Sequence, residues 1–156
     1  MSGKRCIRTG ALERKMRRTV AGLVVDGSAE TRIATRLDLE LLGCEVVAEA
    51  ANGPQGLALV YALRPGLVVF GAEMCEVGGI GALEFLRLLR ANAPWAAAVA
   101  LSARMVAESR EEFVREGIAE YLRKPLDREG FARMRLQLDR IGTAAPLRSL
   151  PSTRMD

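Results

Sequence analysis

The chain has 156 residues, of which 49% are apolar and 27% are charged, a composition typical of one globular domain with its own core. No apolar run approaches the roughly 20 residues of a membrane span, and no apolar signal segment follows the basic N-terminus. The absence of histidine excludes Ser/His and Cys/His nucleophile pairs and histidine metal sites. The cysteines form an odd set without CxxC spacing, which indicates a reducing cytoplasm: Cys6, Cys44 and Cys75.

The formal net charge of +4 is concentrated at the N-terminus. Residues 1–18 hold seven Lys and Arg against one Glu, which leaves 16 basic and 18 acidic residues in the rest of the chain. We therefore expect three parts: a disordered basic arm at residues 1–18, a folded domain at residues 19–142 and a flexible tail at residues 143–156. The arm is either a solvated leader or a contact for nucleic acid or an anionic surface.

Residues 20–25 are a short, valine-rich run that ends at Asp26, a pattern typical of a buried strand. Ser28 can cap the following helix, which we expect over residues 29–42 with Gly43 as its stop. Apolar residues recur every four positions along this segment, as in an amphipathic helix whose apolar side packs on the core. The residues of this stripe are Ile33, Leu37 and Leu41.

The rest of the chain continues this alternation of short apolar runs and helical segments, separated by glycine and proline. Further strands are expected, in chain order, at residues 44–49, 67–70, 97–101 and 118–122. Helices are expected at residues 52–62, after the glycine-rich loop 71–81, at 105–116 and at 128–141. The run at residues 67–70 is almost wholly apolar, as a central strand covered on both faces must be.

Five strand-helix units with short connections predict an α/β fold with a parallel sheet, because parallel neighbours need crossover connections. We expect a flavodoxin-like doubly wound domain, (βα)5, with strand order 2-1-3-4-5 and helices on both faces. Ligands of such sheets bind beyond the carboxyl ends of the strands, so the informative residues are those around each strand end. They are Asp26, Gly27, Gly71, Ser102 and Lys124.

Four segments at these positions resemble the receiver domains of bacterial response regulators. LVVDGS at residues 23–28 is similar to the first-strand segment of the family, and RPGLVVFGAEMCEVGG at residues 64–79 is similar to its phosphorylation segment. ALSA at residues 100–103 matches the switch hydroxyl, and AEYLRKP at residues 119–125 matches the tyrosine, lysine and proline of the fifth strand. All four occur in the family's order and spacing, so the chain is identified as a member of the receiver family.

The resemblance also shows which parts of the family's phosphorylation site are missing. In receivers, a divalent cation is held by an acidic pair and by the aspartate that accepts the phosphoryl group. Here the second acid is Gly27 and the acceptor is Gly71, so aspartyl phosphate cannot form at position 71. Asp26 is the one remnant metal ligand, and we expect weak or absent Mg²⁺ binding and no other cofactor. In the family, the residue at the position of Glu73 contributes only its backbone to the metal site. We therefore expect the Glu73 side chain to point away from this site.

Residues of the family's response machinery are retained. The resemblance implies that Lys124 would contact a phosphoryl group, that Ser102 would move toward it, and that the aromatic side chain of Tyr121 would then turn inward. Without a phosphoryl group, we expect Lys124 to pair with Asp26. The geometry would then be fixed rather than switched.

These features predict a stand-alone pseudo-receiver that is not an enzyme and has no catalytic residues. We expect it to act in a bacterial two-component or phosphorelay pathway by binding a protein, or a second copy of itself, without phosphorylation. The contact surface would be the face formed by the helix at residues 105–116, the strand at 118–122 and the helix at 128–141. Its candidate residues are Arg104, Arg110, Tyr121, Arg123 and Arg128.

Two other functions stay open from the sequence alone. The same arginines, or the basic arm, have the chemistry to bind nucleic acid or an anionic nucleotide messenger such as a cyclic dinucleotide, because guanidinium groups bind phosphates through paired hydrogen bonds. The segment DGSAET at residues 26–31 partly resembles the phosphate-binding loop of a flavodoxin-type enzyme, but the receiver motif explains it equally well.

Overall fold

The computed structural model describes residues 19–144. The predicted basic arm at residues 1–18 lies outside the described residues, and so does the predicted tail at residues 143–156 from residue 145 onward. Within residues 19–144, no helix is both long enough and apolar enough to cross a membrane.

The described residues form five strands that alternate with five helices. The strands are β1 (Ala21–Val25), β2 (Glu45–Ala50), β3 (Leu67–Gly71), β4 (Ala97–Ser102) and β5 (Glu120–Arg123). The helices are α2 (Ala29–Leu41), α3 (Gly53–Leu63), α4 (Ala82–Asn92), α5 (Ala107–Arg115) and α6 (Arg128–Ala144). All strand pairs are parallel, and their order β2-β1-β3-β4-β5 confirms the doubly wound sheet predicted from the sequence.

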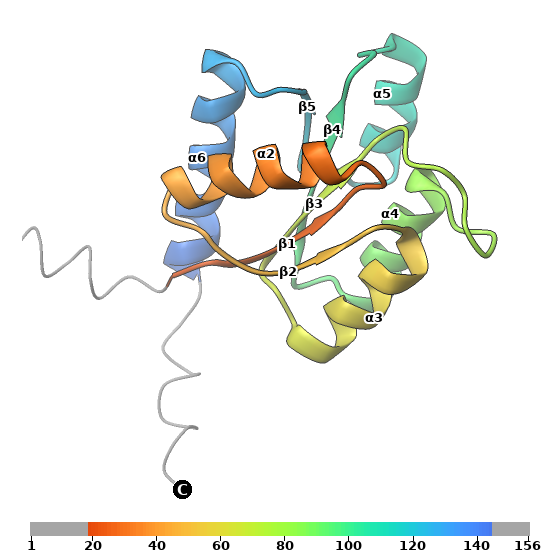
Figure 1. The fold of residues 1–156 in the computed structure, drawn as a ribbon, viewed down its shortest axis with the longest axis horizontal. Helices are drawn as coiled ribbons and strands as arrows, with labels where there is room; N and C mark the ends of the chain where they lie inside the picture. Colours follow the sequence, from red (N-terminus) through yellow and green to blue (C-terminus); the bar gives the residue numbers. More distant parts are fainter. Residues whose placement is uncertain (1–18, 145–156) are drawn as a thin grey trace, which may run out of the picture.

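Helices cover both faces of the sheet, with α2 and α6 on one side and α3, α4 and α5 on the other (Figure 1). Phe70, Phe85 and Phe113 pack together on the three-helix side. On the two-helix side, Val24 of β1 packs in one cluster with Leu39 and Met134. Every residue of β3 is buried, which confirms that this strand is central.

The predicted orientation of the first helix is wrong. The stripe of Ile33, Leu37 and Leu41 faces solvent, with 56%, 55% and 77% of these residues exposed. Thr35 and Leu39 are the buried residues of α2 instead. A four-residue spacing identifies a helical face but not the surface that it contacts.

Ion pairs between α2 and β2 accompany this orientation. Arg36 Nη1 lies 2.7 Å from Glu49 Oε2, and Arg32 Nε lies 3.4 Å from Glu49 Oε1. The two arginines therefore sit beside the edge strand, and the apolar stripe next to them is turned away from the sheet. The N-terminal cap is as predicted, since the Thr31 amide donates to Ser28 Oγ at 3.2 Å.

Two helix boundaries differ from the sequence prediction. The α5 helix begins at Ala107 rather than at residue 105, because Met105 has a left-handed backbone conformation with φ of 54°. The α6 helix continues past Gly142 to Ala144, so this glycine does not end it. The first of these differences matters for function, because the segment before α5 follows the strand end that carries Ser102.

Candidate functional site

The carboxyl ends of the strands bring the predicted site residues to one end of the sheet. Asp26 follows β1, Gly71 ends β3, Ser102 ends β4 and Lys124 follows β5. The parallel registers place Gly71 beside Leu101 on the neighbouring strand, one residue before Ser102. Residues from four separate parts of the chain therefore meet at one site.

Asp26 and Lys124 form an ion pair at the centre of this site. Lys124 Nζ donates to Asp26 Oδ2 at 2.9 Å, and Asp26 is only 6% exposed. The second carboxylate oxygen, Oδ1, accepts from the Ser28 amide at 2.9 Å. The predicted Asp26–Lys124 pair is thus confirmed, and both oxygens of the carboxylate are engaged within the protein.

Gly71 lies directly against this ion pair. A Cβ atom built at position 71 would lie 2.5 Å from Asp26 Oδ2 and 3.4 Å from Lys124 Nζ. The first distance is shorter than any real contact, so the carboxylate at the end of the Asp26 side chain would have to shift to admit a side chain at position 71. Gly27 is different, because a Cβ atom there would meet only the Ala51 carbonyl oxygen, at 3.7 Å.

The residues at this site do not fit a divalent cation. Mg²⁺ in proteins is held by carboxylates together with water or phosphate oxygens. Asp26 uses its oxygens on Lys124 and the Ser28 amide, while Gly27 and Gly71 offer no side-chain ligand. Across residues 19–144, no three His, Cys, Asp or Glu side chains cluster as a metal site would require.

Glu73 occupies an unexpected position at the same end of the sheet. Ser102 Oγ donates to Glu73 Oε2, and the Ala103 amide donates to Glu73 Oε1 at 3.1 Å. The prediction that the Glu73 side chain points elsewhere is therefore wrong. A turn after β3, in which the Met74 amide donates to the Gly71 carbonyl oxygen at 3.2 Å, carries Glu73 to these donors. The one feature of the sequence that could have indicated this contact is the position of the Glu73 carboxylate, two residues after the central strand.

The hydroxyl of Ser102 also organises the loop that follows β4. Its Oγ accepts from the amides of Arg104, at 3.1 Å, and Met105, at 2.9 Å. Ser102 is fully buried, and both of these hydrogen bonds are partly buried. The hydroxyl thus connects Glu73 to the backbone of residues 103–105.

Tyr121 points into the protein rather than toward solvent. The residue is 6% exposed, and its ring packs edge-on against Phe113 with the ring centroids 5.4 Å apart. Its hydroxyl is buried and finds no hydrogen-bond partner among the described residues. A buried hydroxyl without a partner costs folding free energy, so the aromatic packing outweighs that cost here.

The predicted interaction face contains a groove of about 320 Å³ between α5, β5 and α6. Three of the five predicted residues line it, namely Arg110, Tyr121 and Arg123. Arg104 and Arg128 are exposed but do not line this groove. The structure adds residues that sequence reasoning did not single out: Met105, Glu120, Leu122, Asp127, Glu129, Gly130 and Arg133.

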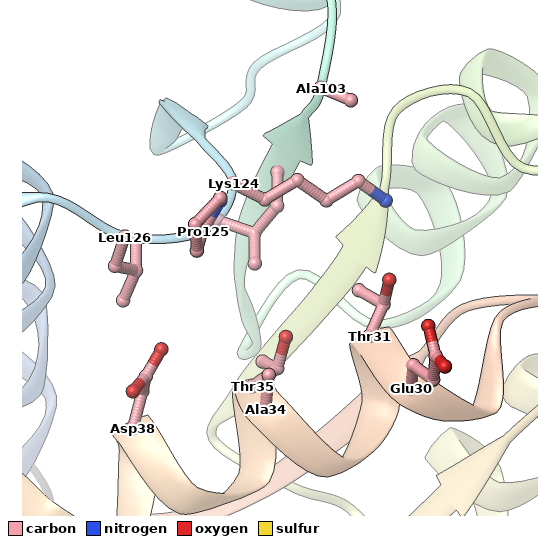
Figure 2. A pocket seen from close by; sticks show the side chains of 10 residues that line it. Glu30, Thr31, Ala34, Thr35, Asp38, Ala103, Lys124, Pro125 and Leu126 are labelled. Carbon is pink, nitrogen blue, oxygen red and sulfur yellow. The ribbon is translucent and has the colours of Figure 1, made fainter.

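A second pocket, of about 310 Å³, lies between α2 and the loop after β5. In Figure 2 the Lys124 side chain extends across the carboxyl end of the sheet, above Thr31 and Thr35 of α2. Asp38 lies at the far end of the pocket, and partial burial raises the pKa of its carboxyl group. Sequence reasoning missed this pocket because its walls come from segments far apart in the chain.

Comparison with known proteins agrees with this geometry. Residues 23–134 match the response regulator receiver domain family. The chain belongs to this family. A receiver domain of this family from Methanospirillum hungatei has a similar structure, with a TM-score of 0.70, 21% identity, and coverage of 82% of this chain and 100% of that one. The fold and the place of this receiver in two-component signalling are therefore established.

Two curated relatives are similar in sequence. Protein-glutamate methylesterase/protein-glutamine glutaminase 6 of Anaeromyxobacter dehalogenans is 36% identical over 138 residues, which cover 85% of this chain and 37% of that protein. An uncharacterized 14.6 kDa protein of Leptolyngbya boryana is 34% identical over 105 residues, covering 67% of this chain and 79% of that protein. This chain spans between 17% and 37% of the length of the methylesterases that it matches.

Proposed function

We propose that this receiver is a pseudo-receiver that signals by binding a protein partner, without phosphorylation and without catalytic activity. The partner is a component of a bacterial two-component or phosphorelay pathway, in the cytoplasm, or a second copy of this chain. The contact surface is the groove between α5, β5 and α6 and its rim, called the α5–β5–α6 face below.

The observation that carries this proposal is the environment of Gly71. Glycine has no nucleophile, and the Asp26–Lys124 pair takes up the space next to it. Asp26 alone is a poor ligand set for Mg²⁺, so metal binding is weak or absent and the family's phosphoryl transfer has neither acceptor nor metal. The domain therefore has to signal to its partner through the shape of its surface and through direct contact.

The chemistry of the α5–β5–α6 face suits a protein partner. Its groove is lined by three arginines and three carboxylates, a mixture that matches the alternating charges of a protein surface better than a phosphate. These residues are Arg110, Arg123, Arg133, Glu120, Asp127 and Glu129. The strand β5 is the edge of the sheet, so its outer side is open to contact.

The test uses charge reversal on this face in the full chain. Tagged wild-type protein, the Arg110→Glu/Arg123→Glu variant and the Arg135→Glu control are compared by affinity capture from the source organism and by sedimentation velocity. Arg135 is an exposed residue of α6 that does not line the groove. We expect the double variant to lose a partner, or self-association, that wild type and control retain with or without acetyl phosphate. Binding that survives the double change, or that requires acetyl phosphate, contradicts the proposal.

The three arginines of the groove also favour a second candidate, the binding of an anionic nucleotide messenger. The carboxylates around them argue against it, since Arg133 already pairs with Glu120 at 3.4 Å and with Glu129 at 3.0 Å. Calorimetric titration with a cyclic dinucleotide at low salt separates the two candidates. Heat that saturates at one equivalent, and is lost in the Arg110→Glu/Arg123→Glu variant, would replace the protein-binding proposal with this one.

A further inference from the structure

The carboxylate of Glu73 makes an unusual pair of contacts for a side chain on an exposed loop. Its two oxygens accept from two different donors at the end of β4, the hydroxyl of Ser102 and the amide of Ala103. Glu73 itself is exposed, while Ser102 is fully buried, so the carboxylate closes the site from the solvent side. An anionic oxygen is the strongest acceptor for such donors.

The contacts of Glu73 continue from Ser102 into the loop before α5. Ser102 Oγ donates its proton to Glu73 and accepts from the amides of Arg104 and Met105. These two acceptor contacts stabilise the left-handed backbone of Met105, which is a costly conformation for a residue with a side chain. The orientation of one hydroxyl is therefore linked to the shape of residues 103–106.

The same loop borders the proposed contact surface. Met105 lines the groove of the α5–β5–α6 face, as does Tyr121. The ring of Tyr121 is buried against Phe113, which is the single buried residue of α5. A change at Ser102 would thus reach the groove through Met105 and through the position of α5.

We propose that Glu73 is a positioning residue that supplies, from within the chain, the negative oxygens that a phosphoryl group supplies in other receivers. Its carboxylate holds Ser102, the loop at residues 103–106 and the inward Tyr121 in one arrangement without any input. Lys124 takes no part, because it is paired with Asp26. This inference rests on the proposed function, since it explains how the α5–β5–α6 face keeps one shape in the absence of phosphorylation.

The experiment compares the full-length wild type with Glu73→Ala, Glu73→Gln and a matched control, Glu76→Ala. Glu76 is an exposed carboxylate of the same loop and has no hydrogen bond to β4. Amide hydrogen exchange and NOE contacts of the Tyr121 ring are measured by NMR. The isosteric Glu73→Gln variant keeps one acceptor oxygen and removes the charge, which separates loss of charge from loss of the whole side chain.

We expect exchange of the Ala103 and Met105 amides to become roughly tenfold faster in Glu73→Ala, equivalent to about 1.4 kcal/mol. Glu73→Gln should give an intermediate increase, and Glu76→Ala should match the wild type. In Glu73→Ala the NOE contacts between Tyr121 and Phe113 should also weaken. Unchanged exchange at residues 103–105, or equal changes in Glu76→Ala, would overturn the inference.

The two proposals fail in distinguishable ways. Unchanged amide exchange in Glu73→Ala removes the role of Glu73 but leaves the partner-binding test of Arg110 and Arg123 standing. The proposed function is wrong, whatever the exchange data show, if the wild-type chain is phosphorylated or if its partner binds without using the α5–β5–α6 face.

Discussion

Lys124 and Asp26 are separated by 98 positions in the sequence, yet the lysine Nζ lies 2.9 Å from the carboxylate Oδ2. Their contact is placed where a side chain at position 71 would otherwise lie, since a Cβ atom there would be 2.5 Å from the same oxygen. The loss of the acceptor carboxylate is therefore matched by an ion pair that closes the space. This relationship links the missing chemistry to the stability of the domain.

The ion pair itself gives the first prediction. Replacing Lys124 with Met leaves the carboxylate of Asp26, which is 6% exposed, without its cation, and we expect a loss of about 3 kcal/mol in the free energy of unfolding. The Asp26→Asn/Lys124→Met double variant should lose less than the sum of the single changes, by about 1–3 kcal/mol. Urea denaturation measures the free energy of unfolding of the double variant and of the two single variants, Lys124→Met and Asp26→Asn. Additive losses would mean that the two groups do not interact.

Restoring an aspartate at position 71 should harm the protein rather than revive it. In Gly71→Asp the new side chain meets Asp26 and Lys124, so we expect a loss of about 1–3 kcal/mol in stability. The control is Gly27→Asp, where the exposed site has room and the change should cost less than about 1 kcal/mol. Thermal unfolding without Mg²⁺ compares them. Equal stability of the two variants would show that the Asp26–Lys124 pair moves aside at no cost in free energy.

The hydroxyl of Tyr121 should be dispensable for folding. Because it is buried without a partner among the described residues, Tyr121→Phe should leave the free energy of unfolding unchanged or raise it by up to about 1 kcal/mol. Tyr121→Ala removes the ring packed on Phe113 and should cost about 3 kcal/mol or more. Urea denaturation distinguishes the two. A clear loss in Tyr121→Phe would reveal a hydrogen bond that the structure does not contain.

The two described cysteines should differ in reactivity. Burial raises the pKa of the Cys44 thiol to about 12, with Glu45 and Glu40 adding to the effect, whereas Cys75 is exposed. In a Cys6→Ser background at pH 8, iodoacetamide should modify Cys75 at least a hundredfold faster than Cys44. Peptide mass spectrometry gives both rates. Similar rates in the folded protein would contradict the burial of Cys44.

The raised pKa of the Cys44 thiol also predicts how the stability of the protein changes with pH. The folded protein keeps this thiol protonated at a pH where the unfolded chain ionises it, so ionisation favours unfolding. The stabilising contribution is present below pH 9 and is lost as the pH rises from 9 toward about 12. The difference in unfolding free energy between wild type and Cys44→Ala should therefore shrink over this range. A constant difference would rule out a contribution from ionisation of this thiol.

Much of the fold follows from local patterns in the sequence. The apolar run at residues 67–70 has no polar position to expose, which predicts a central strand, and all of β3 is buried. The pairing of Asp26 with Lys124 could be expected because both follow strands of one parallel sheet, and a lysine is long enough to cross it. Rules that depend on strand ends and on wholly apolar runs therefore predicted this part of the fold correctly.

The errors of sequence reasoning share a physical origin. The face of α2 was predicted wrongly because a four-residue period does not say which side of a helix contacts the sheet, and the pairing of Arg32 and Arg36 with Glu49 of β2 leaves no trace in that period. The side chain of Glu73 was misplaced because its partners, Ser102 and the Ala103 amide, lie about 30 positions away. Both contacts join segments that are distant in the chain, and a local pattern carries no information about which distant donor a carboxylate meets.

The most direct test of the account is whether the full-length chain accepts a phosphoryl group. Wild-type protein is incubated with acetyl phosphate and Mg²⁺, beside a receiver that retains its acceptor aspartate, and both are analysed by intact-mass spectrometry. The account predicts no gain in mass for this chain while the control protein gains one phosphoryl group. A hydroxylamine-sensitive gain of one phosphoryl group on this chain would contradict it.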